Sequence, residues 1–228
     1  MFSLVIPTYN EAENVGPCVG AVCRALDGRE FEVIIADDDS PDRTWEIARN
    51  LDNPRVRVLR RTEDRGLAPA VVDGFAAAQG DRLGVMDADL QHDEAILPEM
   101  IDALDTHEFV IGSREAEGGG YGEMPFARRL GSKAAAALAR RVLKVPLGDP
   151  MSGFFALRRE VFERVRGRLD PRGYKIMLEI FCLARPESHF EVGYTFRPRH
   201  TGRSKVSAGV AGHYLSDLFQ LRRRLREE

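Results

Sequence analysis

The chain has 228 residues, enough to bury a sizeable hydrophobic core as one large domain or two small ones. Hydrophobic residues make up 43% of it and charged residues 30%, and the formal net charge of −3 argues against binding to nucleic acid through bulk electrostatics. Three cysteines (Cys18, Cys23 and Cys182) fit neither a disulfide framework nor a metal-site spacing, so a reducing, cytoplasmic setting is expected.

No segment of the chain predicts export or membrane insertion. The N-terminus lacks a basic start and a long apolar run, so no signal peptide is expected. The longest apolar stretches, such as residues 134–139, are far shorter than the roughly 20 residues needed to cross a bilayer. We therefore expect a chain that is soluble or attached to a membrane surface.

The first half alternates short apolar runs with amphipathic segments. Strands are predicted at residues 2–6, 31–36, 56–59, 83–87 and 109–112. Helices are predicted between them, at residues 11–26, 42–50, 67–79 and 94–104. This alternation predicts an α/β fold with a mostly parallel sheet flanked by helices on both faces.

The second half continues without a linker, which favours a single domain. Residues 115–125 are rich in glycine and predict a loop, and residues 126–143 predict a helix. Next come a turn at residues 151–155, a helix within residues 173–184 and a strand-like segment at residues 190–199. A last amphipathic helix, residues 210–226, ends in clustered arginines and is expected either to lie on a membrane or to pack on the domain.

Polar clusters follow three of the predicted strands, at residues 7–11, 37–42 and 87–91. The carboxyl ends of parallel strands meet at one edge of a sheet, where ligands bind. In the third cluster Asp87, Asp89 and Gln91 place two carboxylates and an amide within reach of one another, a donor set that suits Mg²⁺ or Mn²⁺. Such a pair of acids also occurs in solvated turns.

The second cluster is partly explained by helix capping, because Ser40 or Asp42 can cap the next helix. Asp37 and Asp38 remain at the strand end, where an acid commonly holds the ribose or base of a nucleotide. The glycine motif of dinucleotide-binding proteins and the P-loop motif are both absent from the sequence.

These motifs together resemble a known family. LVIPTYNEAENV (4–15), DDDSPD (37–42) and MDADLQH (86–92) resemble the inverting family 2 glycosyltransferases, whose fold is called GT-A. The later segments GDPMSGFFALRREVFE (148–163), GYKIMLEI (173–180) and F-R-x-R-x-x-G-x-S-K (196–205) are similar to those of the polyprenyl-phosphate (dolichyl-phosphate) mannose synthases. The resemblance covers nearly the whole chain.

The resemblance implies a metal-dependent transfer of mannose from GDP-mannose to a polyprenyl monophosphate, with inversion at the sugar. The implied metal ligands are Asp87, Asp89 and Gln91, and the implied nucleotide pocket contains Pro7, Tyr9, Glu11 and Asp37. Arg114, Arg128 and Ser132 match groups that hold the acceptor phosphate, and together with Asp89 they form the implied catalytic set. Arg199 and Lys205 match a basic segment that closes on the diphosphate. Residues 1–112 are then a nucleotide-sugar half, residues 113–208 an acceptor half and residues 209–228 a helical tail.

The chemistry of this reaction agrees with the distribution of charge along the chain. A cation neutralises the diphosphate leaving group, and a lipid phosphate is already an anionic nucleophile that needs positioning more than a base. Acids stand at the early strand ends, and Arg, Ser and Lys stand in the later loops. Such an enzyme is expected to act peripherally at the cytoplasmic face of a membrane, alone or with a small membrane subunit.

Departures from the subgroup leave alternatives open. Asp93 and Glu94 stand where two prolines are usual, and Asp39, Asp64 and Arg203 also differ from the usual residues. The donor could instead be UDP-glucose or another UDP-sugar.

Two rivals change the reaction itself. A transferase that extends a glycan hydroxyl would need a base, for which Glu179 is the only obvious candidate. A non-catalytic nucleotide-sugar-binding protein is the rival from another class. Locally, Arg114 could merely pair with Glu115 or Glu117, Arg128 could be solvated, and His92 is expected to be structural rather than a metal ligand.

Overall fold

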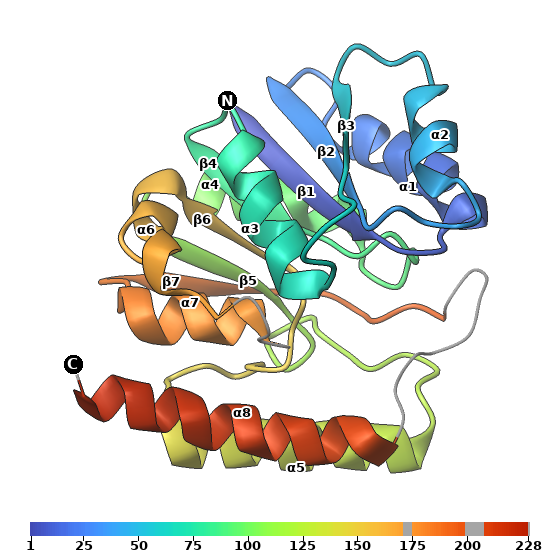
Figure 1. Cartoon of the computed structure of the whole chain (residues 1–228). Helices are drawn as coiled ribbons and strands as arrows, with labels where there is room; N and C mark the ends of the chain where they lie inside the picture. The colour runs from blue at the N-terminus through green and yellow to red at the C-terminus, as the bar shows by residue number, and fades with distance from the viewer. Residues whose placement is uncertain (171–174, 199–207, 228) are drawn as a thin grey trace.

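The protein is built around one seven-stranded sheet with the strand order β3-β2-β1-β4-β6-β5-β7 (Figure 1). The computed structural model describes residues 1–170, 175–198 and 208–227. The strands are β1 (Phe2–Thr8), β2 (Phe31–Asp37), β3 (Val56–Arg60), β4 (Arg82–Val85), β5 (Phe109–Ser113), β6 (Phe155–Arg158) and β7 (His189–Gly193). β1 to β4 pair in parallel, as do β5 and β7, whereas β6 is antiparallel to both of its neighbours.

Helices cover both faces of the sheet. One face carries α1 (Ala12–Ala25), α2 (Thr44–Arg49), the 3₁₀ turn η1 (Glu94–Ile96) and α4 (Leu97–Ala103). The other carries α3 (Leu67–Ala77), α6 (Arg159–Glu163), the 3₁₀ turn η2 (Arg166–Arg168) and α7 (Ile176–Ala184). Beyond α7, α5 (Phe126–Leu143) and α8 (Ala208–Glu227) lie side by side at the bottom of Figure 1.

The alternation of side chains along the central strand explains the two layers. In β1, Leu4 and Ile6 are fully buried on the face of α1, and Val5 is fully buried on the face of α3. A strand that is apolar on both faces requires cover on both sides, as parallel sheets do.

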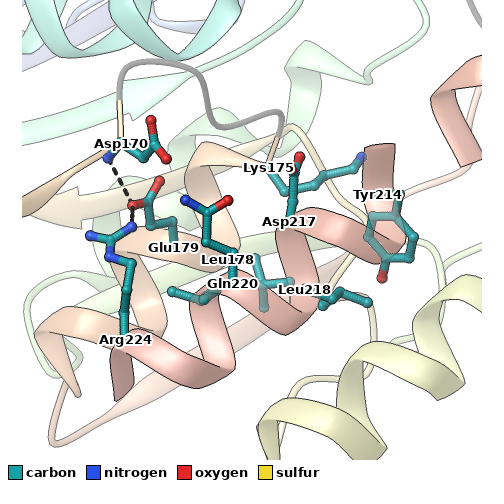
Figure 2. A pocket seen from close by; sticks show the side chains of 10 residues that line it. Asp170, Lys175, Leu178, Glu179, Tyr214, Asp217, Leu218, Gln220 and Arg224 are labelled. Atoms are coloured by element: carbon teal, nitrogen blue, oxygen red, sulfur yellow. Dashed lines mark hydrogen bonds and ion pairs between the residues drawn. The ribbon is translucent and has the colours of Figure 1, made fainter. Parts of the chain in front are cut away.

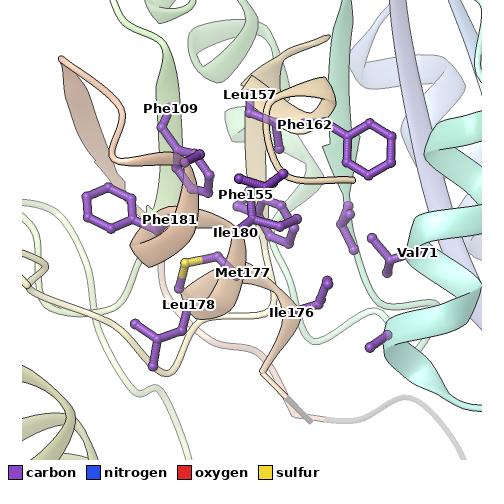
Figure 3. Close-up of a cluster of buried hydrophobic side chains, with 14 of the residues drawn as sticks. Val71, Phe109, Phe155, Leu157, Phe162, Ile176, Met177, Leu178, Ile180 and Phe181 are labelled. Atoms are coloured by element: carbon purple, nitrogen blue, oxygen red, sulfur yellow. The ribbon is translucent and has the colours of Figure 1, made fainter. Parts of the chain in front are cut away.

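Contacts between aromatic rings join the late strands to each other and to the helices packed on them (Figure 3). The rings of Phe109 on β5 and Phe155 on β6 stack with centroids 5.7 Å apart, and Phe181 of α7 meets Phe109 edge to face at 5.3 Å. Phe75 of α3 meets Phe162 of α6 edge to face at 5.1 Å. Buried aromatic pairs of this kind contribute about 0.5–1.5 kcal/mol beyond the burial of their area. The second half of the chain is thereby packed into the same core as the first.

The expectation of an α/β fold with a mostly parallel sheet is confirmed, and each strand predicted in the first half is present. The strand predicted at residues 83–87 ends at Val85, so Asp87 lies in the turn that follows. The helix predicted at residues 94–104 is divided into η1 and α4, with Pro98 in the first turn of α4. The short antiparallel β6 was not predicted.

The last helix packs on the domain. Tyr214, Leu218 and Leu221 of α8 are buried in the core, and the Tyr214 hydroxyl donates to Ala135 O of α5 at 2.9 Å. The side chains of Val210 and Leu215, expected on the same apolar face, lie outside the described ones. Among the described residues, no helix combines the length and the hydrophobicity that a membrane span requires.

Gly74 lets α3 pack closely against Val5 of the sheet and gives a test of this packing. A Cβ at Gly74 would lie 2.4 Å from Val5 Cγ1, so Gly74→Ala forces α3 away from β1. We expect the free energy of unfolding, measured in urea, to fall by about 2 kcal/mol. As the control, Gly16→Ala in α1 meets only Leu51 at 3.7 Å and is expected to keep or slightly raise stability. Equal stability of both variants would contradict this packing.

Candidate active site

A cavity of about 800 Å³ opens at the edge of the sheet where β1, β2, β4 and β5 end. Its volume is in the range of small-molecule sites, and its place is the one where α/β sheets bind ligands. The residues after β1 and β4 line one part of the cavity, and Arg114 after β5 lines it with α5 and α7. The residues predicted from the sequence that line it are Pro7, Tyr9, Glu11, Asp87, Asp89, Gln91, Arg114, Arg128 and Ser132.

Asp37 ties the ends of β1 and β2 together behind the cavity wall. Its carboxylate is fully buried and accepts hydrogen bonds from Thr8 Oγ1 (2.7 Å), Ser40 Oγ (2.7 Å) and Ser40 N (2.8 Å). Ser40 Oγ in turn accepts the backbone N–H of Asn10. Asp37 is outside the cavity lining, and its geometry is that of a residue that shapes the loop carrying Tyr9.

The neighbouring Asp38 is the acid that reaches the cavity at the end of β2. Its carboxylate pairs with the buried Arg61 and accepts the backbone N–H of Gly66 at 2.7 Å. These bonds hold the loop before α3 against the end of β2. The sequence singled out both acids, and the structure separates an inward-facing Asp37 from a cavity-facing Asp38.

A tight turn after β4 presents Asp87, Asp89 and Gln91. Leu90 at its centre has a left-handed φ of 62°, uncommon for a residue with a bulky side chain. Asp89 Oδ1 accepts the backbone N–H of Gln91 at 3.1 Å, and the Gln91 side-chain nitrogen donates to Arg197 O at 3.1 Å. The strained turn therefore brings two carboxylates and one amide to the same cavity.

His92 supports this turn from behind. Its Nδ1 accepts the backbone N–H of Asp87 at 3.3 Å, which leaves Nε2 protonated and 3.9 Å from Asp87 Oδ2. The ring is buried among Phe154, Tyr194 and Phe196. Burial lowers the pKa of His92 to about 4, so the ring is neutral at physiological pH.

The donor set fits a hard divalent cation that completes its shell with ligand oxygens. Two carboxylates plus an amide oxygen match the way Mg²⁺ is commonly held, through one or two acids together with phosphates and water. In the described part of the chain, no three His, Cys, Asp or Glu side chains are arranged to hold a metal by themselves. A cation here would therefore be held by Asp87, Asp89 and Gln91 together with its bound substrate.

Arg114 stands across the cavity in a buried ion pair with Asp149. Arg114 Nε and Nη2 each donate to one Asp149 oxygen at 2.7 Å, and the Arg114 backbone N–H donates to the same carboxylate. Burial alone would raise the pKa of Asp149, but the bonds from Arg114 hold it below its usual value. The pair fixes Arg114 on Asp149 rather than on Glu115 or Glu117, and it leaves Nη1 as the nitrogen available to an anion.

The first turns of α5 supply the other polar groups on this side. Arg128 and Ser132 line the cavity, four residues apart on one helix face. Arg128 is otherwise exposed, so it stands at the rim, while Ser132 is half-buried. The neighbouring Phe126 and Leu130 are 77% and 58% exposed. These two apolar side chains lie on the side of α5 away from Arg128 and Ser132, because residues two positions apart on a helix do not share a face.

Lys175, at the start of α7, is the cation that sequence reasoning did not assign. It lines the cavity and donates from Nζ to Met151 O at 3.3 Å. Burial, with a further contribution from Arg114, lowers the pKa of Lys175 to about 8.

Glu179, one turn further along α7, faces a separate small pocket (Figure 2). Its carboxylate accepts Arg224 Nη1 at 2.6 Å and Asp170 N at 2.8 Å. Glu179 is outside the lining of the large cavity, and the structure resolves its ambiguous role as an ion pair with α8.

The remaining predicted residues, Arg199 and Lys205, lie outside the described residues. Residues that the sequence did not assign but that line the cavity include Lys175, Ser152, Gly153, Tyr194 and Tyr214. Lys175, Ser152 and Gly153 lie within segments 148–163 and 173–180, which resemble those of the polyprenyl-phosphate mannose synthases. The sequence therefore indicates these segments, but it does not indicate which of their residues line the cavity. Tyr194 and Tyr214 carried no local signal.

The fold, the acidic turn after β4 and the cations across the cavity define a glycosyltransferase of the GT-A class. The chain belongs to glycosyl transferase family 2, whose family model matches residues 3–166.

Relatives in this family are similar to the chain over most of its length. It is 44% identical over 223 residues to the dolichol-phosphate mannosyltransferase of Pyrococcus furiosus, covering 96% of this chain and 63% of that protein. It is 35% identical over 232 residues to the enzyme of the same name from Saccharomyces cerevisiae, covering 96% and 86%. It is 35% identical over 216 residues to the undecaprenyl-phosphate mannosyltransferase of Micrococcus luteus, covering 91% and 88%. The chain thus spans less than two thirds of the Pyrococcus protein.

Solved structures share the fold at lower identity. Glucosyl-3-phosphoglycerate synthase from Mycobacterium tuberculosis, in complex with Mn²⁺, UDP and phosphoglyceric acid, superposes with a TM-score of 0.74 at 20% identity. The match covers 99% of this chain and 78% of that one. The same enzyme with Mn²⁺, UDP-glucose and phosphoglyceric acid gives a TM-score of 0.73. At this identity the likeness shows the fold alone.

Burying the Lys175 ammonium costs stability, and the cost depends on pH. The folded-state pKa of about 8 lies below the ordinary lysine value of 10.5, so the full cost is present below pH 8 and disappears as pH rises toward 10.5. Lys175→Met is therefore expected to raise the melting temperature at pH 7 by about 3 °C, and by progressively less above pH 8. Calorimetry across this range tests it. The exposed Lys144→Met is the control, and a pH-independent difference would contradict the assignment.

Proposed function

We propose that this chain transfers mannose from GDP-mannose to a polyprenyl monophosphate, with Mg²⁺ or Mn²⁺, at the cytoplasmic surface of a membrane. The observation that carries the proposal is one cavity lined by Asp87 and Asp89 on one side and by Arg114 and Arg128 on the other. The names of the relatives, dolichol-phosphate and undecaprenyl-phosphate mannosyltransferases, support the acceptor class and the sugar.

The side lined by residues 7–11, Asp38 and the turn after β4 is proposed as the donor side. Tyr9 and Pro7 offer apolar surface to a base, and Asp38 offers a carboxylate to sugar hydroxyls. Asp87, Asp89 and Gln91 would hold the cation, which would supply the positive charge that a diphosphate leaving group needs. His92 keeps the Asp87 backbone in place without adding a charge of its own.

The opposite side is proposed to hold the acceptor phosphate. Arg114, fixed by Asp149, presents a preoriented guanidinium, and Arg128 and Lys175 add positive charge from α5 and α7. Ser132 can donate a hydroxyl hydrogen bond to the same phosphate. Positioning an anionic nucleophile in this way removes much of the entropic barrier to attack on the sugar.

Transfer to a glycan hydroxyl is less well supported. That reaction needs a base, and Glu179 is committed to Arg224 and Asp170 outside the cavity lining. An acceptor that already carries negative charge does not need such a base, and the cations facing the cavity suit it.

The helix at the rim of the cavity suits a lipid-linked acceptor. Phe126 and Leu130 are exposed on the first turns of α5, on the side of the helix away from the cavity-lining Arg128 and Ser132. An exposed apolar helix face close to the cavity suits contact with the membrane that holds a polyprenyl phosphate. We accordingly assign residues 1–112 to the donor and residues 113–208 to the acceptor, with α8 packed beside α5, and leave open a small membrane partner.

The donor and the acceptor are tested with a panel. Purified protein with Mn²⁺ is incubated with labelled GDP-mannose, UDP-glucose or other nucleotide sugars and a short polyprenyl phosphate. The expected result is a lipid product that mild acid cleaves, from GDP-mannose and not from UDP-sugars. Transfer from UDP-glucose alone would change the donor, transfer only to a glycan hydroxyl would overturn the proposal, and no transfer at all would favour a binding protein.

Asp89→Asn tests the proposed metal site. The change removes one carboxylate charge while keeping the shape of the turn, so metal-dependent transfer is expected to fall at least about 100-fold. Asp27→Asn, on the exposed surface, is the control and keeps wild-type activity. Circular dichroism checks that both variants fold, and a fully active Asp89→Asn would remove the site as described.

Arg128→Ala tests the acceptor side. Removing one phosphate contact is expected to raise the KM for polyprenyl phosphate about tenfold, with the KM for the donor nearly unchanged. Arg141→Ala is the matched control, because Arg141 is an exposed arginine on the same helix outside the cavity lining. Equal acceptor KM values for the two variants would place the phosphate elsewhere.

A further inference from the structure

The segment that follows β7 is fastened to the turn after β4 through Arg197. The Arg197 backbone N–H donates to Gln91 O at 2.9 Å, and the Gln91 side-chain nitrogen donates to Arg197 O at 3.1 Å. The guanidinium donates from Nη1 to Glu94 Oε2 at 2.7 Å and from Nη2 to Asp93 Oδ1 at 2.6 Å. One residue thus holds the turn with its backbone and its side chain together.

These contacts decide which end of the Gln91 amide faces the cavity. An amide has a donating nitrogen and an accepting oxygen, and a divalent cation binds only the oxygen. Because the nitrogen of Gln91 donates to Arg197 O, the oxygen is left for the cavity. A flipped amide would place two oxygens against each other and turn the nitrogen toward the cation.

The Arg197 guanidinium stabilises this orientation of the Gln91 amide. Its fork onto Asp93 and Glu94 joins the segment to the stretch just after Gln91, so the Arg197 carbonyl cannot move away from the amide without breaking both ion pairs. Phe196, the preceding residue, meets the ring of His92 edge to face, with ring centroids 6.1 Å apart. The Arg114 guanidinium carbon lies over the Phe196 ring, 5.7 Å from its centroid. The segment is thereby fixed on both sides of the cavity.

We propose that Arg197 is a positioning residue for the candidate cation site: it fixes the Gln91 amide with its oxygen toward the cavity and so raises the affinity for a divalent cation. The inference rests on the proposed function only in requiring a cation at Asp87 and Asp89. The predicted effect of removing Arg197 is weaker cation binding. A simple charge effect would be the opposite, because the removal of a nearby positive charge would by itself strengthen cation binding.

The test measures Mn²⁺ binding to the full chain without substrates, from the electron paramagnetic resonance signal of free Mn²⁺. Arg197→Ala is expected to weaken binding about tenfold, as loss of a partner that orients a ligand does. Gln91→Ala is expected to weaken it similarly. Because Arg197 acts through Gln91, the double variant should bind no more weakly than Gln91→Ala alone.

Arg29→Ala is the matched control. Arg29 forks onto both Asp102 oxygens at 2.6 and 2.8 Å, with a similarly exposed side chain, and lies outside the cavity lining. It should leave the Mn²⁺ affinity unchanged. Should Arg197→Ala fail to fold, Arg197→Lys keeps the charge and the backbone contacts but cannot form the fork, and is expected to bind with intermediate affinity.

Unchanged or tighter binding by Arg197→Ala or Arg197→Lys would overturn the inference while leaving the metal site intact. Additive losses in the double variant would also overturn it, because Arg197 would then act independently of Gln91. A wild-type chain that binds no Mn²⁺ would overturn the metal site itself and the inference with it.

Discussion

The ion pair between Arg114 and Asp149 is the interaction on which the geometry of the later half depends. It joins the end of β5 to the turn before β6, and the backbone N–H groups of Gly148 and Asp149 bond in turn to Glu191 of β7. A buried pair of this kind costs several kcal/mol of desolvation per ion, which its hydrogen bonds must offset. In return, a guanidinium is held rigid at the edge of a cavity where a mobile one would lose entropy on binding an anion.

The two sides of the cavity are built on different principles. On the side of β1 and β2, a buried carboxylate such as Asp37 accepts hydrogen bonds from neighbouring hydroxyls and backbone N–H groups, so its hydrogen-bonding capacity is met within the loops. On the side of α5 and α7, Arg128 and Lys175 reach the cavity from helices, and the Lys175 ammonium is buried without full compensation. Burial of the Lys175 ammonium therefore lowers folding stability beside the cavity, and such a loss is typical of functional sites.

Much of this could be predicted from the sequence, because local patterns are strong where the chain alternates strand and helix. The helix at residues 126–143 coincides with α5, and the polar clusters do converge on one sheet edge. β6 was missed because its four residues are too few to show a period. The partner of Arg114 was missed because Asp149 is 35 residues away, and only the pairing of β5 with β6 brings the two together. The inward turn of Asp37 depends equally on tertiary hydrogen bonds that no spacing reveals.

The direction of β6 has a consequence for how the site is assembled. In a purely parallel sheet, only carboxyl ends reach the ligand edge, so each strand delivers one outgoing loop there. Because β6 runs the other way between β4 and β5, the chain arrives at that edge through the amino end of β6, bringing Asp149, Ser152 and Gly153. Gly153 then lies 3.6 Å, measured from an ideal Cβ, from an Asp87 oxygen. One reversed strand therefore places an outgoing and an incoming piece of chain against each other in the lining of one cavity, so a substitution in either piece changes the surroundings of the other.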